Sequence, residues 1–294
     1  MQMRTMTVTT AYEGRTAASV LKACFGVSET YLRRLKTRPG SVLLNGEPVY
    51  VVARVKSGDT LSFDPSDGER FPIRPIPFPL SYIYEDEWFA VVDKPKNLSV
   101  HPSRDPDEPT VENALAAHFT GFENPHPVSR LDKGTTGLML VAKSGYAHAL
   151  FKAQQADGRY QKRYLAILNG IPKTRHFTIE APIGEKAGST YQREVRRDGA
   201  YAKSECTVLA TRSGFALCEL IPHTGRTHQL RVHMAHAGYP LLGDWLYGVR
   251  SDTVDRPMLH AAQLVFCHPI RGEQLSLRAP MPDDFLIYFP SEQY

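Results

Sequence analysis

The spacing of apolar residues changes along the chain, and each change predicts a different kind of structure. Over residues 16–40 the apolar positions recur at helical spacing, which predicts two short helices, with Ser28 as the N-cap of the second. The pattern then becomes strand-like, and tight turns predicted at Asn45-Gly46 and at residues 57–59 separate the strands. The first 65 residues therefore predict a compact unit of two helices followed by three strands.

Prolines interrupt this pattern between residues 65 and 80. Proline cannot donate a backbone hydrogen bond and fixes its own φ, so a run of prolines predicts a semi-rigid, extended chain. The prolines are Pro65, Pro72, Pro75, Pro77 and Pro79. We therefore expect a small domain over residues 1–65, a Pro-rich linker over 66–80 and a larger domain over 81–294.

Beyond residue 80, strand-like runs that neighbour each other in sequence outnumber strand–helix–strand units. The predicted segments are paired strands on either side of residues 85–87, a helix from Ser144 to Gly158, a strand over 162–170, a hairpin around 212–214 and a helix over 227–238. This order favours an α+β domain with a mostly antiparallel sheet flanked by helices.

Positive charge is concentrated in the first domain. The whole chain has a net charge of +4, and residues 1–65 carry nine Lys and Arg against five Asp and Glu, so the remainder is about neutral. A small basic module on a balanced body fits contact with a polyanion. The alternative is a solvated helix face that carries Arg33, Arg34, Lys36 and Arg38. Charge alone leaves both interpretations open.

Missing signals disfavour several classes of protein. Residues 1–14 lack the apolar core of a signal peptide, and no 18-residue apolar run predicts a membrane span. The cysteines form no CxxC pair, so we expect buried reduced thiols in a cytoplasmic protein. These cysteines are Cys24, Cys206, Cys218 and Cys267. The phosphate-binding patterns GxxxxGK(S/T) and GxGxxG and the nucleophile motif GxSxG do not occur.

Four histidines lie close together in sequence, at His223, His228, His233 and His236. On a helix only His233 and His236 share a face, and no cysteine or carboxylate lies near them in the sequence. We therefore expect polar groups and caps around a helix start, and no metal site.

Asp132 lies between a predicted strand end and the turn "KGTTG", which leads into the apolar run "LMLVAKS". Rigid elements on both sides would position its carboxylate well, which suits a catalytic group. Aspartate also caps its own turn through its side chain, which is a common structural role. The spacing of residues alone does not decide between the catalytic and the structural role of Asp132.

Arg226 lies at the beginning of the predicted helix over residues 227–238. A positive charge there opposes the helix dipole, so another interaction could account for it. It could pair with a buried carboxylate, hold a phosphate, or be an exposed surface arginine.

Five segments together resemble the motifs of the RluA-type pseudouridine synthases, and they occur in the order of that family. They are "DKPKNLSVHP" (93–102), "VSRLDKGTTGLMLVAKS" (128–144), "QKRYLAI" (161–167), "HTGRTHQLRVHMAHAGYPLLGD" (223–244) and "LHAAQLVFCHPIRGEQLSLRAPMPDDF" (259–285). The segment "SETYLRRLKTRPGSVLLNGEPV" (28–49) is similar to the α-L RNA-binding domain that often precedes this catalytic domain.

The resemblance implies an RNA uridine isomerase that needs no cofactor and no metal. In this family the base leaves its sugar through nitrogen, turns, and rejoins the sugar through carbon 5. Carried over by motif, Asp132 is the nucleophile, Arg226 is its ion-pair partner, and Tyr164 stacks on the target base.

Further residues carry over as contacts of the substrate. Leu230 forms an apolar wall of the pocket, and Arg130 holds the RNA backbone or fills the gap left by the flipped base. Ser129 stands where the family has a histidine, which bears on the choice of target. The residues expected to bind RNA are Arg130, Leu230, Arg231, Ser129, Arg33 and Arg34.

The leading hypothesis is a monomeric pseudouridine synthase that acts on ribosomal or transfer RNA. One alternative is an RNA-binding or assembly factor of the same fold that has lost catalysis. A hydrolase of nucleosides shares the carboxylate chemistry, but the N-terminal RNA-binding module disfavours a free nucleoside as substrate.

Overall fold

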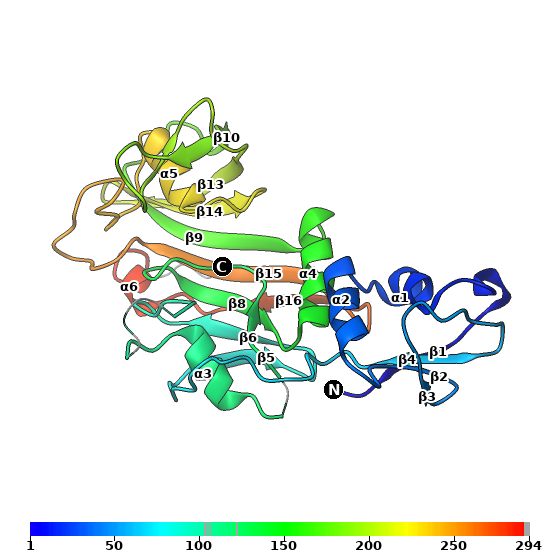
Figure 1. The fold of residues 1–294 in the computed structure, drawn as a ribbon. Helices are drawn as coiled ribbons and strands as arrows, with labels where there is room; N and C mark the ends of the chain where they lie inside the picture. Colours follow the sequence, from blue (N-terminus) through cyan, green and yellow to red (C-terminus); the bar gives the residue numbers. More distant parts are fainter. Residues whose placement is uncertain (103–104, 106, 122, 291–294) are drawn as a thin grey trace.

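The computed structural model describes residues 1–102, 105, 107–121 and 123–290. A small lobe at the N-terminus stands beside a larger body that is built on one long sheet (Figure 1). The body is α+β with a mostly antiparallel sheet, as the order of its predicted elements indicated.

The small lobe contains the predicted helices and strands and one strand that we did not predict. Its helices are α1 (Ala17–Phe25) and α2 (Glu29–Thr37), with a 3-10 turn η1 (Thr10–Tyr12), and its strands are β1 (Arg4–Thr7), β2 (Val42–Leu44), β3 (Glu47–Pro48) and β4 (Thr60–Phe63), in the sheet order β1-β4-β2-β3. The Ser28 cap is confirmed, because its side chain accepts a hydrogen bond from the backbone N–H of Tyr31. Strand β1 escaped prediction because four residues show too little alternation, and only pairing with the distant β4 makes them a strand.

The sheet of the body runs in the order β10-β13-β14-β9-β15-β8-β6-β5. These strands are β5 (Ser81–Glu85), β6 (Phe89–Lys94), β8 (Thr136–Ala142), β9 (Gln161–Asn169), β10 (His176–Glu180), β13 (Lys203–Arg212), β14 (Phe215–Pro222) and β15 (Leu259–Cys267). Two edge pieces, β7 (His126–Pro127) and β16 (Gln274–Arg278), pair with β8 and β15, and β11 (Ile183–Glu185) pairs with β12 (Arg193–Val195). Among the described strands, only β8 and β15 pair in parallel.

The helices of the body are α3 (Val111–His118), α4 (Gly145–Ala156), α5 (Gln229–His236) and α6 (Asp283–Leu286). The predicted cap of α4 is confirmed, because the Ser144 side chain accepts a hydrogen bond from the Ala147 N–H. Helix α5 begins two residues later than expected. His228 adopts the left-handed conformation, with φ of 57°, and cannot belong to a right-handed helix.

The small lobe and the body share one hydrophobic core. Tyr146, at the start of α4, packs against the ring of Phe63 from β4 at 5.2 Å and against Tyr31 from α2 at 5.8 Å. The Tyr146 hydroxyl also donates to the carbonyl of Phe25 at 2.7 Å. Helices α2 and α4 accordingly stand side by side in Figure 1. These contacts fix the position of the small lobe on the body.

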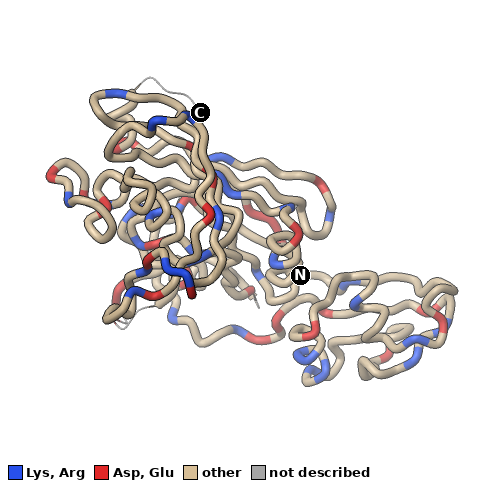
Figure 2. Tube along the Cα trace, turned by 90° about the horizontal axis from the view of Figure 1, so that it is seen from above, with Lys and Arg blue, Asp and Glu red and all other residues tan. Residues whose placement is uncertain are grey.

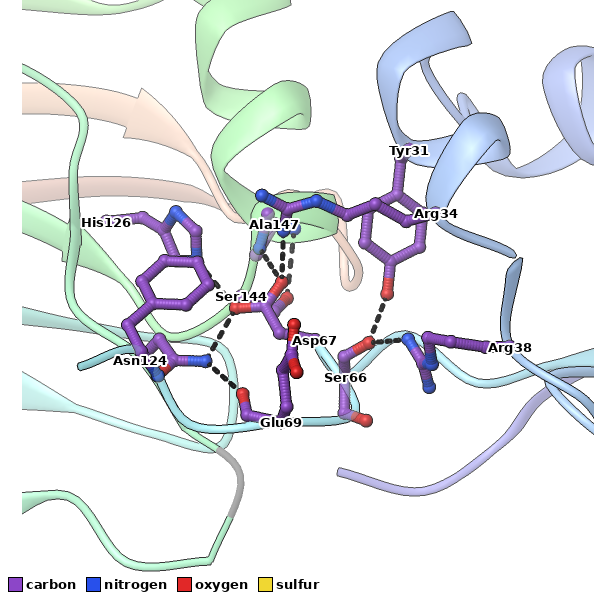
Figure 3. Close-up of polar contacts among 12 residues, drawn as sticks. Tyr31, Arg34, Arg38, Ser66, Asp67, Glu69, Asn124, His126, Ser144 and Ala147 are labelled. Carbon is purple, nitrogen blue, oxygen red and sulfur yellow. Dashed lines mark hydrogen bonds and ion pairs between the residues drawn. The ribbon is translucent and has the colours of Figure 1, made fainter. Parts of the chain in front are cut away.

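A buried carboxylate at the start of the Pro-rich segment holds the same junction together (Figure 3). Asp67 accepts hydrogen bonds from Arg34 at 2.8 Å, from the Gly145 N–H at 2.9 Å, from Asn124 at 3.0 Å and from His126 at 2.7 Å. Burial raises the pKa of Asp67, but the hydrogen bond and charge of His126 and the other donors outweigh it, so the pKa is lowered.

The remainder of the Pro-rich segment has no regular secondary structure but lies against the body. Arg70 donates to the carbonyls of Ala116 and Phe119, which are left free at the end of α3, and the Phe71 N–H donates to Asn124. The segment is therefore a strap against the body rather than the free linker that we expected. The domain division at residues 66–80 stays a prediction.

We expect Asp67→Asn to lower the free energy of unfolding by about 2–4 kcal/mol, since it removes a buried charge with several partners. The matched control is Asp198→Asn, because Asp198 pairs with Arg196 on the surface, where solvent screens the pair, and its replacement should leave the free energy of unfolding nearly unchanged. Urea unfolding measures the free energy of unfolding of both variants.

The contribution of Asp67 to stability depends on pH. Folding lowers the pKa of Asp67, so this contribution is present above the unfolded pKa of about 3.9 and is lost as pH falls through the lower folded value. Equal losses in the two variants, or a difference that persists far below pH 4, would contradict this role.

Candidate active site

Asp132 lies in the loop between β7 and β8, and backbone hydrogen bonds hold that loop. The Thr135 N–H donates to the carbonyl oxygen of Asp132 at 3.0 Å, so the backbone closes the turn and leaves the carboxylate free for other partners. The buried Lys94 amine donates to the carbonyls of Lys133 at 3.1 Å and Leu98 at 3.0 Å, and ties the loop to the end of β6. The carboxylate is therefore carried on a rigid loop.

The ion-pair partner of Asp132 is Arg231, whose Nη1 lies 3.0 Å from Asp132 Oδ2. The prediction of Arg226 as this partner is wrong. Because α5 begins at Gln229, Arg226 lies in the turn before the helix, where its Nε donates to the carbonyl of Tyr201 at 2.9 Å. Arg231 lies inside the helix on a buried face and reaches Asp132.

Asp244 clamps the other side of the Arg231 guanidinium. Its two carboxylate oxygens accept from Nε and Nη2 of Arg231, each at 2.8 Å, in a bidentate arrangement. Asp244 is 0% exposed and Arg231 is 6% exposed. Burial opposes the charge of Arg231, but the hydrogen bonds and charge of Asp244 outweigh it and raise the pKa of the guanidinium. The clamp therefore fixes a permanent positive charge that faces Asp132.

His228 and Tyr247 complete the polar surroundings of Asp132. The Tyr247 ring lies under the Arg231 guanidinium at 5.1 Å, and its hydroxyl oxygen accepts from the Arg193 N–H at 2.9 Å. The hydroxyl can then donate to His228 Nδ1 at 2.7 Å. Burial lowers the pKa of His228, although the charge of Asp132 opposes that shift. If the Tyr247 hydroxyl donates to Nδ1, the neutral His228 ring carries its proton on Nε2, which lies 3.8 Å from Asp132 Oδ2.

Apolar side chains and a phenol form the other side of the site. Tyr164 from β9 belongs to the same buried cluster as Leu131, which precedes the carboxylate, and Leu230, which precedes the arginine. Burial raises the pKa of Tyr164, and the negative charges of Tyr160 and Asp132 would add to that rise, so its hydroxyl stays protonated at neutral pH. The structure therefore brings together the predicted Asp132, Tyr164 and Leu230.

A carboxylate held by a buried arginine, beside an aromatic ring among buried apolar side chains, suits chemistry on a sugar and a planar base. Comparison with known proteins identifies that chemistry. The family described as RNA pseudouridylate synthase matches residues 88–236, which contain Asp132, Tyr164 and Arg231.

The chain belongs to the RNA pseudouridylate synthase family. It is therefore an enzyme of the isomerase class that acts on RNA.

Individual relatives support this assignment along most of the chain. An uncharacterized RNA pseudouridine synthase of Bacillus subtilis is 36% identical over 263 residues, which cover 88% of this chain and 93% of that protein. Ribosomal large subunit pseudouridine synthase D of Pseudomonas aeruginosa is 40% identical over 224 residues, 70% of each chain. The solved structure of human RNA pseudouridylate synthase domain containing 1 is similar with a TM-score of 0.58 and 28% identity, over 69% of this chain and 83% of that one.

The residues that we expected to bind RNA lie in different surroundings. Arg33 and Arg130 are exposed, and Ser129 is half-buried. Arg34 donates to the buried Asp67, so its guanidinium is part of the junction between the lobes. Arg231 is part of the ion pair with Asp132. Figure 2 shows Lys and Arg mixed with Asp and Glu over both lobes, and contact of Arg33, Arg34, Arg130 and Ser129 with RNA stays a prediction.

The histidines and cysteines divide between structural and surface positions. Buried His233 bonds with the Ser204 hydroxyl and the Ala181 carbonyl, each at 2.9 Å, as expected for a polar group in the core. Cys206 and Cys218 are buried thiols, as expected. Cys267 is only half-buried, and Cys24 is exposed because it lies on the outer face of α1, which corrects the expectation for these two residues. Among the described residues, no group of three or more His, Cys, Asp and Glu could hold a metal. No described helix is both long and apolar enough to span a membrane.

Sequence reasoning missed the roles of Arg231, Asp244, His228 and Tyr247. A usable signal existed for the arginine, because Arg231 stands between the apolar residues Leu230 and Val232. An arginine in a buried segment needs a carboxylate partner, whereas Arg226 follows a glycine in a polar turn. No local pattern distinguishes Asp244 from other aspartates in loops.

Proposed function

We propose that the enzyme converts uridine to pseudouridine in the RNA of the large ribosomal subunit, with Asp132 as the catalytic carboxylate. The observation that carries this proposal is the ion pair between Asp132 and Arg231, 3.0 Å long and clamped from behind by Asp244. The guanidinium stabilises a carboxylate next to an apolar pocket, where an unpaired charge would be costly. It also fixes which face of the carboxylate is presented to a substrate.

The reaction is balanced without any second reactant. The bond between N1 of the base and C1′ of the ribose breaks, and a bond between C5 and C1′ forms. The proton on C5 is lost and N1 gains a proton, so the product is an isomer of the substrate. Asp132 either attacks C1′ directly or removes a proton from the ribose; both routes need its ionised form.

The remaining pocket residues have roles that follow from their chemistry. Tyr164 and the apolar side chains of Leu131 and Leu230 offer the target uracil a flat, dry surface. The uridine must leave its stack to reach them, which costs a few kcal/mol and less in a loop than in a duplex. The protonated Tyr164 hydroxyl can donate a hydrogen bond to the base as it detaches and turns.

Two relatives named ribosomal large subunit pseudouridine synthase D, from Pseudomonas aeruginosa and Haemophilus influenzae, support ribosomal RNA as the substrate. The Haemophilus protein is 35% identical over 86% of this chain. Transfer RNA is the other substrate class that the motifs allow. An inactive RNA-binding protein is disfavoured, because the carboxylate and its arginine are both present in a paired geometry.

Tritium release tests this function. Transcripts of large-subunit ribosomal RNA and of transfer RNAs, labelled with tritium at C5 of uridine, are incubated with the wild-type enzyme. We expect release from the ribosomal transcript, at a small whole number of uridines per molecule, and little from transfer RNA. Release from transfer RNA alone would overturn the choice of substrate, and no release from any cellular RNA would overturn catalysis itself.

A further inference from the structure

A hollow of about 850 Å³ lies beside the loop that carries Asp132, and the chemistry described above does not use it. It is lined by Lys96, Gly243, Trp245, residues 250–255 and Asp284. One wall follows β6, and the other is the long loop between α5 and β15, which extends away from the sheet in Figure 1.

Both walls of the hollow are attached to the catalytic groups. Trp245 directly follows Asp244, the carboxylate that clamps Arg231. On the other wall, Lys96 lies two residues after Lys94, which donates to the carbonyl next to Asp132. The hollow therefore borders the segments that hold Asp132 and Arg231 in place.

Trp245 is 62% exposed, although tryptophan side chains are usually largely buried. The only other tryptophan, Trp88, is 7% exposed and belongs to the core. An exposed indole beside the active site of an RNA-modifying enzyme offers a face on which a base can stack, a contact that tolerates any base.

The charges around the hollow favour a base over a phosphate group. Lys96 pairs with Asp255 at 2.9 Å, and Asp284 pairs with Arg256 at 2.7 Å. Two further charged lining residues, Arg250 and Asp252, have opposite signs and no ion pair within the described part of the chain. With two positive and three negative side chains, the lining has no net positive charge to attract a phosphate, but it offers a flat apolar ring and hydrogen-bonding side chains.

We propose that this hollow binds an unpaired nucleotide of the RNA substrate that neighbours the target uridine, with its base stacked on Trp245. The proposal rests on the proposed function, because the target uridine is placed at Asp132. It explains how the enzyme could hold the strand after the target base has left its stack. The carboxylate of Asp252 and the guanidinium of Arg250 would then contact the edge of that base.

Tryptophan fluorescence tests the site directly, because Trp245 is the exposed one of the two tryptophans. The Asp132→Asn enzyme, which prevents turnover, is titrated with pentauridylate, pentacytidylate and pentaadenylate, and with ribose 5-phosphate as a probe without a base. We expect the oligonucleotides to quench the emission and to protect it from acrylamide, and ribose 5-phosphate to do neither. No quenching, or equal quenching by ribose 5-phosphate, would overturn the proposal.

The affinity for an oligonucleotide tests whether stacking on Trp245 contributes to binding. Trp245→Ala should raise the Kd for a fluorescein-labelled pentanucleotide about tenfold, within the range measured for loss of one base–aromatic stack. Trp245→Phe should raise it less, since an aromatic ring remains. Val249→Ala is the matched control, because Val249 is as exposed and lies in the same loop outside the hollow, and it should leave the Kd within twofold. Equal Kd values for wild type and Trp245→Ala would refute the site.

Turnover distinguishes failure of this site from failure of the proposed function. With the ribosomal transcript, Trp245→Ala should raise KM about tenfold and change kcat less than about threefold, because the stack holds substrate without touching the reacting atoms. If the wild-type enzyme releases tritium and Trp245→Ala has an unchanged KM, only the nucleotide site at Trp245 is rejected. If the wild-type enzyme releases no tritium, the substrate assignment is rejected, whereas the fluorescence result still tests the nucleotide site by itself.

Discussion

Replacement of Asp132 by asparagine is expected to remove tritium release from labelled RNA by a factor of at least about 10⁴, the scale of losses when a catalytic nucleophile is removed. The amide has nearly the same shape as the carboxylate but carries no negative charge and cannot act as a nucleophile or base. The clamp of Arg231 by Asp244 remains in this variant, so the pocket should keep its form. Single-turnover release with excess enzyme measures the effect.

Three comparisons make the Asp132 result specific. Binding of the same RNA should change less than about threefold, which shows that chemistry and not recognition is lost. Asp157→Asn is the matched control, since Asp157 pairs with Arg159 on the surface and should retain full activity. Asp132→Glu keeps the charge but moves it by one methylene group, and we expect it to be nearly inactive because the rigid loop cannot follow. Appreciable turnover by Asp132→Asn would remove the carboxylate from the mechanism.

The second large effect is expected at Arg231, and it separates this arginine from Arg226. Arg231→Lys retains a positive charge but loses the planar fork that bonds Asp244 and Asp132 at once. We expect it to lower kcat about 10²-fold or more, on the scale of losing one positioned electrostatic donor. Arg226→Ala should cost less than about tenfold in kcat, because the Arg226 side chain donates to a backbone carbonyl away from the carboxylate.

Stability provides an independent readout for the same pair of arginines. Arg231→Met leaves the carboxylate of Asp244 buried without a cation, which should lower the free energy of unfolding by about 3–5 kcal/mol. Removing both members, in Arg231→Met with Asp244→Leu, should recover much of that loss without recovering activity. Urea unfolding of the single and double variants tests this.

A larger loss of activity in Arg226→Ala than in Arg231→Lys would restore Arg226 as the ion-pair partner of Asp132, as the motif implied.

The shared core changes how the N-terminal lobe can be studied. Deletion of residues 1–65 would test RNA binding cleanly only if the lobes were independent. The deletion instead exposes Tyr146, which packs on Phe63 and Tyr31, and leaves Asp67 without Arg34. A loss of RNA affinity in a truncated enzyme would therefore have two sources, the removal of positive charge and the exposure of the shared core. Substitution of the exposed Arg33 leaves the junction intact and is the better probe of charge.

Features set by neighbours in sequence could be predicted from the sequence. The helix α4 begins after its Ser144 cap, and β8 contains most of the predicted apolar run but begins at Thr136, within the Thr-Thr-Gly stretch. The hairpin of β13 and β14 turns at Ser213 and Gly214, both with positive φ. The ordered motifs likewise identified the family and placed Asp132 on a loop held from both sides. The helix, the strand and the hairpin depend on propensity, capping or periodicity over a few residues, whereas the family was identified by the resemblance of ordered motifs.

The tertiary structure alone decided which distant side chains meet. Arg231 pairs with Asp132 across 99 residues of chain, and the choice between Arg231 and Arg226 depends on where α5 begins. That start depends on His228, which adopts the left-handed backbone conformation. Tyr247 and the surroundings of Asp132 hold the His228 ring in place. Asp67 likewise became a junction only when three segments brought four donors to it. The physical reason is the same in each case: a buried charge takes the partner that folding brings within hydrogen-bond distance, and the sequence near either residue does not record that approach.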